Sequence, residues 1–559
     1  MVNRFVLLCL VNLLISRNPD AVGVNGMVVS SNNLASKVGI EILKKGGNAI
    51  DAAIATGFAL AVVHPGAGNI GGGGFMVIRL ESGKITAIDF REVAPKAAYR
   101  DMFLDDSMNV IKGASWETAL AAGVPGSVAG FGMAHQKYGT LKWKSLVSPS
   151  VDLASDGYPL DYQNMRYLNH PYFKDYLSRD LMTKKIFVKD ELFKINEKFI
   201  QKDLGSTLKR IANLGWEEFY TGETAMMISA CMKRTNGLIS LDDLQKYRPI
   251  ERKPIEFEYR GYKVYSMPPA SSGGVAIAGI LNQLENIRLD SLEYHSAQHI
   301  HYVSEAERRV YADRAEFMGD LDFVSVPIDT LISDKYAKSR WESVDSIIAS
   351  NSVDITHGNI QFMYNESDET THYSVVDKWG NAVSVTTTIN GWFGNGIVVD
   401  GAGFLLNNEM DDFSSKPGVP NAYGLIGNEA NSIEPGKRML SSMSPSIVEN
   451  SDGNLFLVVG SPGGSTIITT TAQIIMNVID FGMNLEDAVE NPRFHHQWLP
   501  DVIQMEENRF SIELINALKN RGHSIKYRNS IGEANCIMVK EGLIYGASDS
   551  RRNSSAVGY

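Results

Sequence analysis

The chain has 559 residues, 44% of them hydrophobic and 21% charged, which is the composition of a globular protein with room for two or three domains. Its net charge of -11 and the lack of a basic stripe exclude nucleic acid as the main partner, because phosphate binding requires clustered Lys and Arg. Three cysteines without a C-x-x-C pair exclude a disulfide scaffold and give no signal for structural zinc.

Residues 1–23 have the pattern of an export signal. One positive charge precedes a short apolar run at residues 5–16, and Ala21 and Gly23 place small residues at the positions that a signal peptidase inspects. The run is too short to span a bilayer comfortably, although a retained anchor or a misassigned start would show the same pattern. We therefore expect an exported, periplasmic or secreted protein that loses this segment.

Two helices and a hairpin are expected next. Residues 32–47 (NNLASKVGIEILKKGG) combine an Asn cap, apolar residues at helical spacing and a Gly-Gly stop. Residues 48–65 are almost continuously apolar and predict a helix that is buried on most sides. Residues 74–90 predict a hairpin that turns at residues 81–84, and residues 140–320 are expected to be mostly helical.

The stretch GAGNIG at residues 66–71 matches the G-x-G-x-x-G pattern of dinucleotide sites. Such a motif should follow a strand and open a helix, whereas this one follows a predicted helix and leads into a predicted strand. We therefore expect no nucleotide there. The glycines are better interpreted as allowing close packing, or as turning backbone amides toward a ligand.

The last third of the chain is richer in strands. Residues 371–390 predict two strands, residues 454–465 a strand that runs into a glycine turn, residues 466–482 a helix, and residues 534–548 a final hairpin. The strands lie in the middle of the pattern with helices outside, and no regular βαβ alternation is present. The chain therefore predicts a layered α+β sandwich rather than a doubly wound sheet.

The stretch DETTHYSVV at residues 368–376 allows two interpretations. Thr is a good strand residue, which would explain Thr370 and Thr371 without further chemistry. Alternatively, a Thr whose preceding peptide bond is cut has a hydroxyl beside a free α-amine, which makes it an activated nucleophile. The polar, aperiodic residues 351–369 favour an exposed loop, where proteolysis tends to occur.

Other polar clusters could serve such a nucleophile. The Gly463–Gly464 pair in GSPGGS follows a predicted strand and suits an oxyanion hole, but it fits an ordinary turn equally well. An arginine, two serines and a group of acids could read both ends of an amino acid, although each also fits a surface role. These residues are Arg91, Ser441, Ser442, Glu409, Asp411 and Asp412.

The histidines do not predict a metal site. His295 and His299 would share a helix face that excludes His301, and no H-E-x-x-H pattern is present. His495 and His496 have no spaced partner. We interpret all of them as surface or satisfied core histidines. A G-x-S-x-G serine elbow is absent as well.

Together and in this order, the segments resemble the γ-glutamyltransferases, especially the bacterial periplasmic ones. The match covers nearly the whole mature chain and rests on long motifs, among them GGNAIDAAIATGFALAVVHPGAGNIGGGGFM, IDFREVAP, TTHYSVVDKWGNAVSVTTTIN, LLNNEMDDFSSKPGVPNAYGL, KRMLSSMSPSIV and VVGSPGGSTIITT. The resemblance implies an N-terminal nucleophile hydrolase, a four-layer αββα sandwich around two central antiparallel sheets. It also implies a precursor that cuts its own Glu369–Thr370 bond into a large subunit (residues 24–369) and a small subunit (residues 370–559) within one interleaved domain.

The same resemblance implies roles for single residues. Thr370 would be the nucleophile and its α-amine the base, attacking the γ-glutamyl amide of glutathione or a related compound and passing the acyl group to water, an amino acid or a dipeptide. Thr388 would orient Thr370, while Gly463 and Gly464 would form the oxyanion hole. The γ-glutamyl group would be held by Arg91, Ser441 and Ser442 at its carboxylate, by Asn390, Glu409 and Asp412 at its amine, and by Tyr423 of a lid at residues 417–428. No cofactor or metal is implied, and Glu409 stands where some bacterial members have Gln.

Two other functions fit the same residues. A related enzyme could cleave a different amide, such as poly-γ-glutamate or a cephalosporin side chain, although Arg91, Glu409 and Asp412 favour a free γ-glutamyl head group. A non-catalytic amino-acid-binding protein would never cut itself and would remain a single chain.

Overall fold

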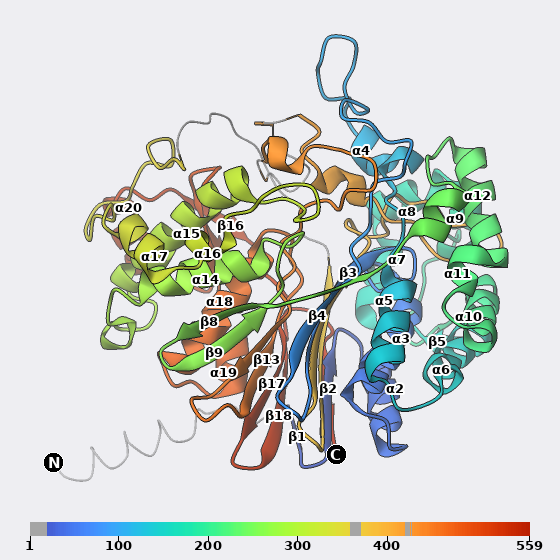
Figure 1. Cartoon of the computed structure of the whole chain (residues 1–559), viewed down its shortest axis with the longest axis horizontal. Coiled ribbons are helices and arrows are strands. Elements are labelled where there is room, and N and C mark those ends of the chain that lie inside the picture. The colour runs from blue at the N-terminus through green and yellow to red at the C-terminus, as the bar shows by residue number, and fades with distance from the viewer. Residues whose placement is uncertain (1–19, 358–369, 417, 420–424, 426) are drawn as a thin grey trace.

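Two seven-stranded sheets pack face to face in the centre of the molecule, and helices cover the outer side of each sheet (Figure 1). The computed structural model describes residues 20–357, 370–416, 418–419, 425 and 427–559. Neighbouring strands in both sheets run antiparallel. This arrangement confirms the expected αββα sandwich. Tyr423, Glu369 and residues 1–19 of the expected export signal lie outside the described residues.

Each sheet mixes strands from both ends of the chain. The first sheet contains, in spatial order, β1 (Ala21–Gly23), β18 (Leu543–Ser548), β17 (Asn535–Lys540), β13 (Leu455–Val459), β12 (Ser446–Glu449), β9 (Tyr262–Ser266) and β8 (Ile255–Tyr259). The second contains β19 (Ser555–Gly558), β2 (Gly26–Ser30), β10 (Thr371–Asp377), β11 (Ala382–Thr388), β3 (Gly73–Arg79), β4 (Ile85–Asp89) and β7 (Ile250–Arg252). Strands from before and after Thr370 are therefore neighbours in both sheets.

Two groups of helices form the outer layers. The helices on the side of the second sheet are α2 (Asn33–Lys44), α3 (Ala49–Val63), α5 (Ser127–Tyr138), α6 (Trp143–Asp156), α7 (Tyr162–Asn169), α8 (Pro171–Ser178), α9 (Leu181–Phe187), α10 (Lys202–Leu214), α11 (Glu218–Thr221), α12 (Glu223–Thr235) and α13 (Leu241–Lys246). Those on the side of the first sheet are α14 (Gly273–Leu284), α15 (Ala297–Phe317), α16 (Ile328–Leu331), α17 (Asp334–Trp341), α18 (Thr466–Ile479), α19 (Leu485–Glu490) and α20 (Ile512–Asn520). Short elements between these are α4 (Ala114–Glu117), η1 (Ala119–Ala121), η2 (Leu289–Ser291), η3 (Glu409–Asp412), η4 (Glu429–Asn431), β5 (Tyr158–Pro159), β6 (Lys198–Phe199), β14 (Phe494–His495), β15 (Ile503–Glu506) and β16 (Ile525–Arg528).

The N-terminal predictions are confirmed. α2 begins after Asn32, whose side chain accepts a hydrogen bond from the N–H of Leu34. Every residue of α3 is buried, as its apolar sequence predicted. The glycines that follow allow close packing, because a Cβ at Gly68 would lie 2.2 Å from the carbonyl oxygen of Leu60. The expectation of mostly helical structure at residues 140–320 is confirmed except at the short strands β5 and β6 and at β7, β8 and β9. In the edge strand β8, IEFEY alternates buried and exposed residues.

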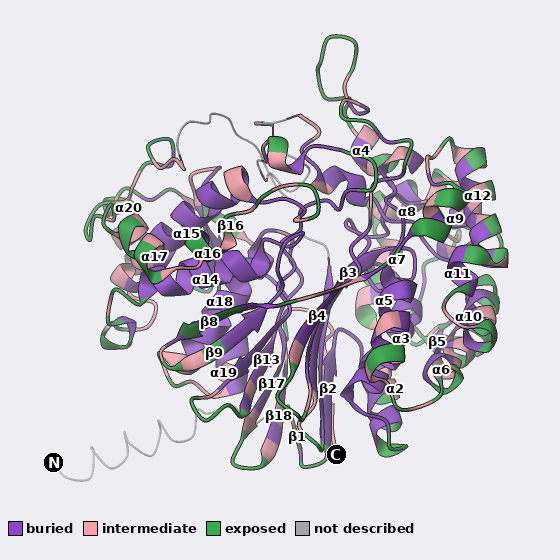
Figure 2. Cartoon of the chain, viewed as in Figure 1, coloured by how far each residue is buried: buried purple, intermediate pink, exposed green. Residues whose placement is uncertain are grey.

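Strand β10 divides its side chains between two layers, and the sheets are buried along most of their length (Figure 2). Val375 packs in the core beside α3, whereas Val376 packs in the core between the sheets. His372 and Ser374 share the inter-sheet face with Val376, because side chains alternate along a strand. Ser374 Oγ donates to the carbonyl oxygen of Asn535 on β17 at 2.8 Å, so a polar bond joins the two sheets.

Both ends of the described chain lie at sheet edges. β1 pairs with β18, and the N–H of Val24 donates to an oxygen of Tyr559 at 3.0 Å. Residues 21–23, which close the expected export signal, therefore belong to the first sheet.

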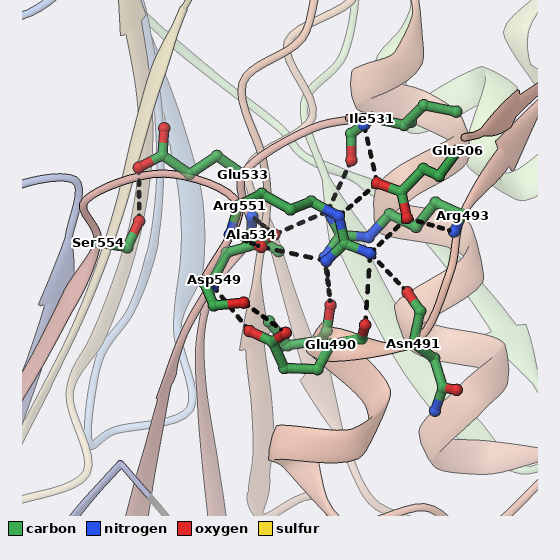
Figure 3. A network of polar contacts seen from close by, with 12 residues as sticks. Glu490, Asn491, Arg493, Glu506, Ile531, Glu533, Ala534, Asp549, Arg551 and Ser554 are labelled. Atoms are coloured by element: carbon green, nitrogen blue, oxygen red, sulfur yellow. Dashed lines mark hydrogen bonds and ion pairs between the residues drawn. The ribbon is translucent and has the colours of Figure 1, made fainter. Parts of the chain in front are cut away.

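An arginine whose side chain is only 4% exposed holds the chain just before β19 (Figure 3). Arg551 donates to Glu506 Oε2 at 2.7 Å and to the carbonyl oxygen of Asn491 at 2.8 Å, and it forms an ion pair with Asp549 at 3.1 Å. The last strand is thus fixed to α19 and β15 by charge as well as by its ladder.

Cys231 on α12 and Cys536 on β17 are buried and free. They lie in the cores on opposite sides of the sandwich, so they do not form the single disulfide that their number allowed. Within the described residues, no helix combines the length and the apolar character needed to cross a membrane.

Gly460→Ala should destabilise the sandwich beside Thr370. A Cβ at Gly460, directly after β13, would lie 2.4 Å from Cε1 of His372, whose ring is held 2.9 Å from Thr386 Oγ1. We expect a loss of about 1–3 kcal/mol in the free energy of unfolding, measured by denaturant titration. Gly453→Asn is the control, since the space around a Cβ at Gly453 is open and Asn tolerates left-handed backbone. Equal losses in both variants would contradict the prediction.

Candidate active site

Thr370 lies directly before β10, near the middle of the second sheet. Only 4% of the residue is exposed. The register of β10 and β11 pairs Thr371 with Thr387, so its continuation places Thr370 opposite Thr388. Thr388 Oγ1 accepts a hydrogen bond from the N–H of Asn390 at 2.8 Å. The strand ladder therefore fixes two hydroxyl side chains next to each other at the strand end.

A pocket opens beside Thr370 and brings together most of the residues that the sequence singled out. Those that line it are Thr370, Thr388, Arg91, Asn390, Asp412, Ser441, Ser442 and Gly464. Glu409 and Gly463 are described but do not line this pocket. Tyr423 lies outside the described residues. Leu425 and Gly427, from the segment that was expected to form a lid, also line the pocket.

The guanidinium of Arg91 is the buried centre of the pocket. Its Nη1 lies 2.6 Å from Glu409 Oε2 and 3.6 Å from Glu92 Oε2, and its Nη2 donates to Asp412. Nε also donates to the carbonyl oxygen of Met439 at 3.3 Å. Glu409 therefore lies behind Arg91 and reaches the pocket only through that guanidinium.

Three carboxyl groups surround this one guanidinium away from water, so they cannot all be ionised. Burial raises the pKa of Glu92 to about 8, and it raises the pKa of Glu409 well above its usual range, in both cases against the effect of Arg91. Burial also raises the pKa of Asp412, but Arg91 and Arg314 both oppose that rise. Asp412 is thus a carboxyl whose charged form two arginines, Arg91 and Arg314, favour.

Arg314, near the end of α15, is a pocket residue that the sequence did not reveal. Its Nε donates to Ser272 Oγ at 2.9 Å and its Nη2 to Ser442 Oγ at 3.2 Å. The side chain lines the pocket and adds a second positive charge near Asp412. The stretch AERRVYADRAEF has several arginines, and nothing in its spacing tells which one faces a site.

The two glycines after β13 adopt backbone that favours glycine. Gly463 has φ 133° and Gly464 has φ 55°, and a Cβ at Gly463 would lie 2.4 Å from Thr466 Oγ1. They stand at the N-terminus of the 14-residue helix α18, where unpaired N–H groups and the helix dipole favour negative charge. Gly464 lines the pocket beside Thr370.

Other candidates lie away from the pocket. Ser115 Oγ donates to Asp411 at 2.5 Å, so this carboxylate does not face Arg91. His301 Nδ1 lies 2.9 Å from His523 Nε2, and these two residues and Glu305 have ligand atoms within 4.8 Å of one another. Arg308 and Arg309 already occupy the Glu305 carboxylate, at 3.2 and 2.7 Å, and a metal ion would have to displace both ion pairs.

Comparisons with known proteins place nearly the whole chain in one family. Residues 35–559 match the family described as Gamma-glutamyltranspeptidase. The chain is 49% identical over 528 residues to the glutathione hydrolase proenzyme of Escherichia coli strain K12, covering 94% of this chain and 90% of that protein. The crystal structure of cephalosporin acylase from Bacillus halodurans matches with a TM-score of 0.84 at 27% identity over 97% of both chains. A chain of the Helicobacter pylori gamma-glutamyltranspeptidase matches with a TM-score of 0.58 at 43% identity, covering 63% of this chain and 100% of that one.

Glu92→Gln should make the protein less sensitive to alkaline pH. The folded-state pKa of Glu92 is about 8 against an ordinary value of 4.5, so the folded state keeps a proton that the unfolded state loses, and stability falls as pH rises between these values. The neutral Gln removes this loss, so the fall in Tm between pH values of about 6 and 8.5 should be smaller. Glu81→Gln, in an exposed turn, should keep the wild-type fall. A fall in Glu92→Gln as steep as in wild type would contradict the prediction.

Proposed function

The chain belongs to the gamma-glutamyltranspeptidase family, and from this premise we propose how its own residues carry out self-cleavage, glutathione hydrolysis and γ-glutamyl transfer. One observation supports the assignment above the others. Thr370, at the start of a strand and next to the point of expected cleavage, lines the same pocket as Asp412 and the buried Arg91.

Self-cleavage comes first. The Thr370 hydroxyl attacks the carbonyl carbon of Glu369, the C–N bond breaks, and the acyl group moves from the Thr370 nitrogen to its oxygen. Water then hydrolyses this ester, leaving a carboxylate on Glu369 and a free α-amine on Thr370. Residues 24–369 become the large subunit and residues 370–559 the small one, and residues 1–23 direct export to the periplasm.

The mature enzyme uses the same hydroxyl again. A free α-amine has an ordinary pKa of about 7.7–8.0, so the Thr370 amine can accept the hydroxyl proton near neutral pH. The oxygen attacks the γ-glutamyl amide, and the backbone N–H groups of Gly463 and Gly464 stabilise the negative charge that develops on the carbonyl oxygen. The leaving amine takes a proton, and the ester on Thr370 passes to water, an amino acid or a dipeptide.

The pocket charges suit a substrate with a free amino acid head. Arg91, Ser441 and Ser442 bind the α-carboxylate, and Asp412 and Asn390 bind the α-ammonium. Glu409 supports Arg91 from behind, and Tyr423 belongs to the segment that closes over the acyl-enzyme. Thr388 orients the nucleophile from the neighbouring strand.

This charge pattern also separates the proposal from other amide substrates. A substrate without an α-ammonium group would place no positive charge of its own opposite the Asp412 carboxyl, so the charges of substrate and pocket would match less well. The higher identity to glutathione hydrolases, 49% against 27% for the cephalosporin acylase, points in the same direction.

Thr370→Ala should abolish both self-cleavage and activity. Ala has no hydroxyl to attack the Glu369 carbonyl, so a denaturing gel should show one chain, and γ-glutamyl-4-nitroanilide should release no 4-nitroaniline. Thr370→Ser keeps a hydroxyl and should still give two pieces. An active Thr370→Ala variant, or a wild type whose small fragment does not begin at Thr370 on N-terminal sequencing, would sink the proposal.

Arg91→Lys should weaken binding of the γ-glutamyl donor while self-cleavage continues. Lysine keeps the positive charge among the buried carboxyls but lacks the fork that binds a carboxylate through two N–H groups. We expect KM for the donor to rise about ten-fold or more, as one lost bidentate contact implies. Arg100→Lys, on the exposed surface, should leave KM unchanged. An unchanged KM in Arg91→Lys would remove Arg91 from the carboxylate site.

A further inference from the structure

A buried hydrogen-bond relay begins at the residue next to the nucleophile. Thr371 Oγ1 donates to Ser31 Oγ at 3.0 Å, and Ser31 in turn hydrogen-bonds the carboxyl group of Glu533. Ser554 Oγ donates to the same carboxyl at 2.5 Å, a contact visible in Figure 3. Ser31, Thr371 and Glu533 are all at most 1% exposed.

The relay joins four segments that are far apart in sequence. Ser31 follows β2, Thr371 opens β10, Glu533 precedes β17, and Ser554 precedes β19. The side chain of Asn535 reinforces the junction, because its Nδ2 donates to the carbonyl oxygen of His372 at 2.9 Å and reaches Ser31 Oγ at 3.5 Å. The backbone on the C-terminal side of the nucleophile is therefore held from both sheets.

The direction of the bonds requires an acceptor at the end of the relay. The Thr371 hydroxyl donates its only hydrogen to Ser31, and Ser31 donates its own to Glu533, so the carboxyl group must accept. Arg552 Nη1 lies 3.8 Å from Glu533 Oε2 and favours the ionised form. Burial works against this and raises the pKa of Glu533 to about 7, while Arg552, Ser554 and Ser31 oppose the rise.

The nucleophile needs such support once the chain is cut. Before cleavage Thr370 is held by peptide bonds on both sides, whereas afterwards it is a chain end whose backbone is attached covalently only through Thr371. A chain end frays unless its neighbours tie it down. An error in position of about 1 Å at a reacting group can cost about a hundred-fold in rate.

We propose that Glu533 is a positioning residue for Thr370, acting through Ser31 and Thr371 to fix the new N-terminus against the substrate carbonyl. The proposal rests on Thr370 being the nucleophile. It extends the site from the pocket into the junction between the sheets and gives the segment before β19 a part in the chemistry through Ser554.

Glu533→Gln tests the proposal. The amide keeps the shape of the side chain, but it carries no charge to hold the Ser31 and Ser554 hydroxyls. In the processed enzyme, kcat for a γ-glutamyl donor should fall about ten-fold, the effect of one lost hydrogen bond to a charged group. KM for the donor should stay within about two-fold of wild type, because Arg91 and Asp412 are untouched. Ser31→Ala should produce the same split between kcat and KM, and it carries the test alone if Glu533→Gln does not fold.

The double variant distinguishes a relay from two separate effects. If Ser31 and Glu533 act in series, Glu533→Gln with Ser31→Ala should be no slower than the slower single variant. Losses that multiply to about a hundred-fold, or a normal kcat with only a lowered Tm, would overturn the proposal. Glu486→Gln is the control, since this buried carboxyl on α19 faces Asp20 and Asp487 instead. Failure here with an inactive Thr370→Ala would leave the nucleophile in place, whereas an active Thr370→Ala would remove the premise itself.

Discussion

The pairing of β10 on both of its edges is the constraint on which the site depends. β2 and β11 flank this strand, and their ladders fix where its first residue stands. Because a strand in that position can hardly slide, the ladder brings Thr370 opposite Thr388 and beside the pocket. The same constraint explains why polar side chains sit between the sheets at this end. His372 and Ser374 are tied to neighbouring strands, so they contribute to the register at little cost in unpaired polar groups.

Burial affects the ionisation of the pocket carboxyl groups as strongly as their distance from Arg91 does. One guanidinium faces three carboxyl groups, and burial raises the pKa of two of them, Glu92 and Glu409, and so favours their protonated forms. The site therefore combines two guanidinium groups, those of Arg91 and Arg314, with the carboxyl group of Asp412, and such charges complement the carboxylate and the ammonium of an amino acid head group. A Gln in place of Glu409 would carry the same charge as the protonated acid.

Much of the fold was accessible from the sequence because its signals are local. The Asn cap of α2, the apolar run of α3 and the hairpin of β10 and β11 all depend on residues that are close together in the sequence. Arg91, Asp412, Ser441 and Ser442 were found through long motifs, not through spacing, and their meeting in one pocket could not be derived from separation in the chain. Arg314 and Glu92 were missed because each becomes recognisable only when a partner from another segment stands beside it. The relay from Thr371 to Glu533 was missed for the same reason, since more than 150 positions separate its ends. Glu409 shows the opposite error. It was expected to bind the substrate amine, but it contacts Arg91 from the side away from the pocket.

The spatial order β19, β2, β10 has a consequence for how the two pieces stay together after cleavage. After the bond before Thr370 is cut, a strand of the large piece is enclosed between two strands of the small piece, and in the other sheet β9 and β12 repeat the exchange. Neither piece can form a complete sheet without strands from the other piece. The two pieces could therefore separate only by unfolding both sheets. Their ratio is one to one because both come from one chain, and folded molecules would not exchange pieces with each other. Each mature molecule therefore keeps the two pieces of the precursor from which it was cut.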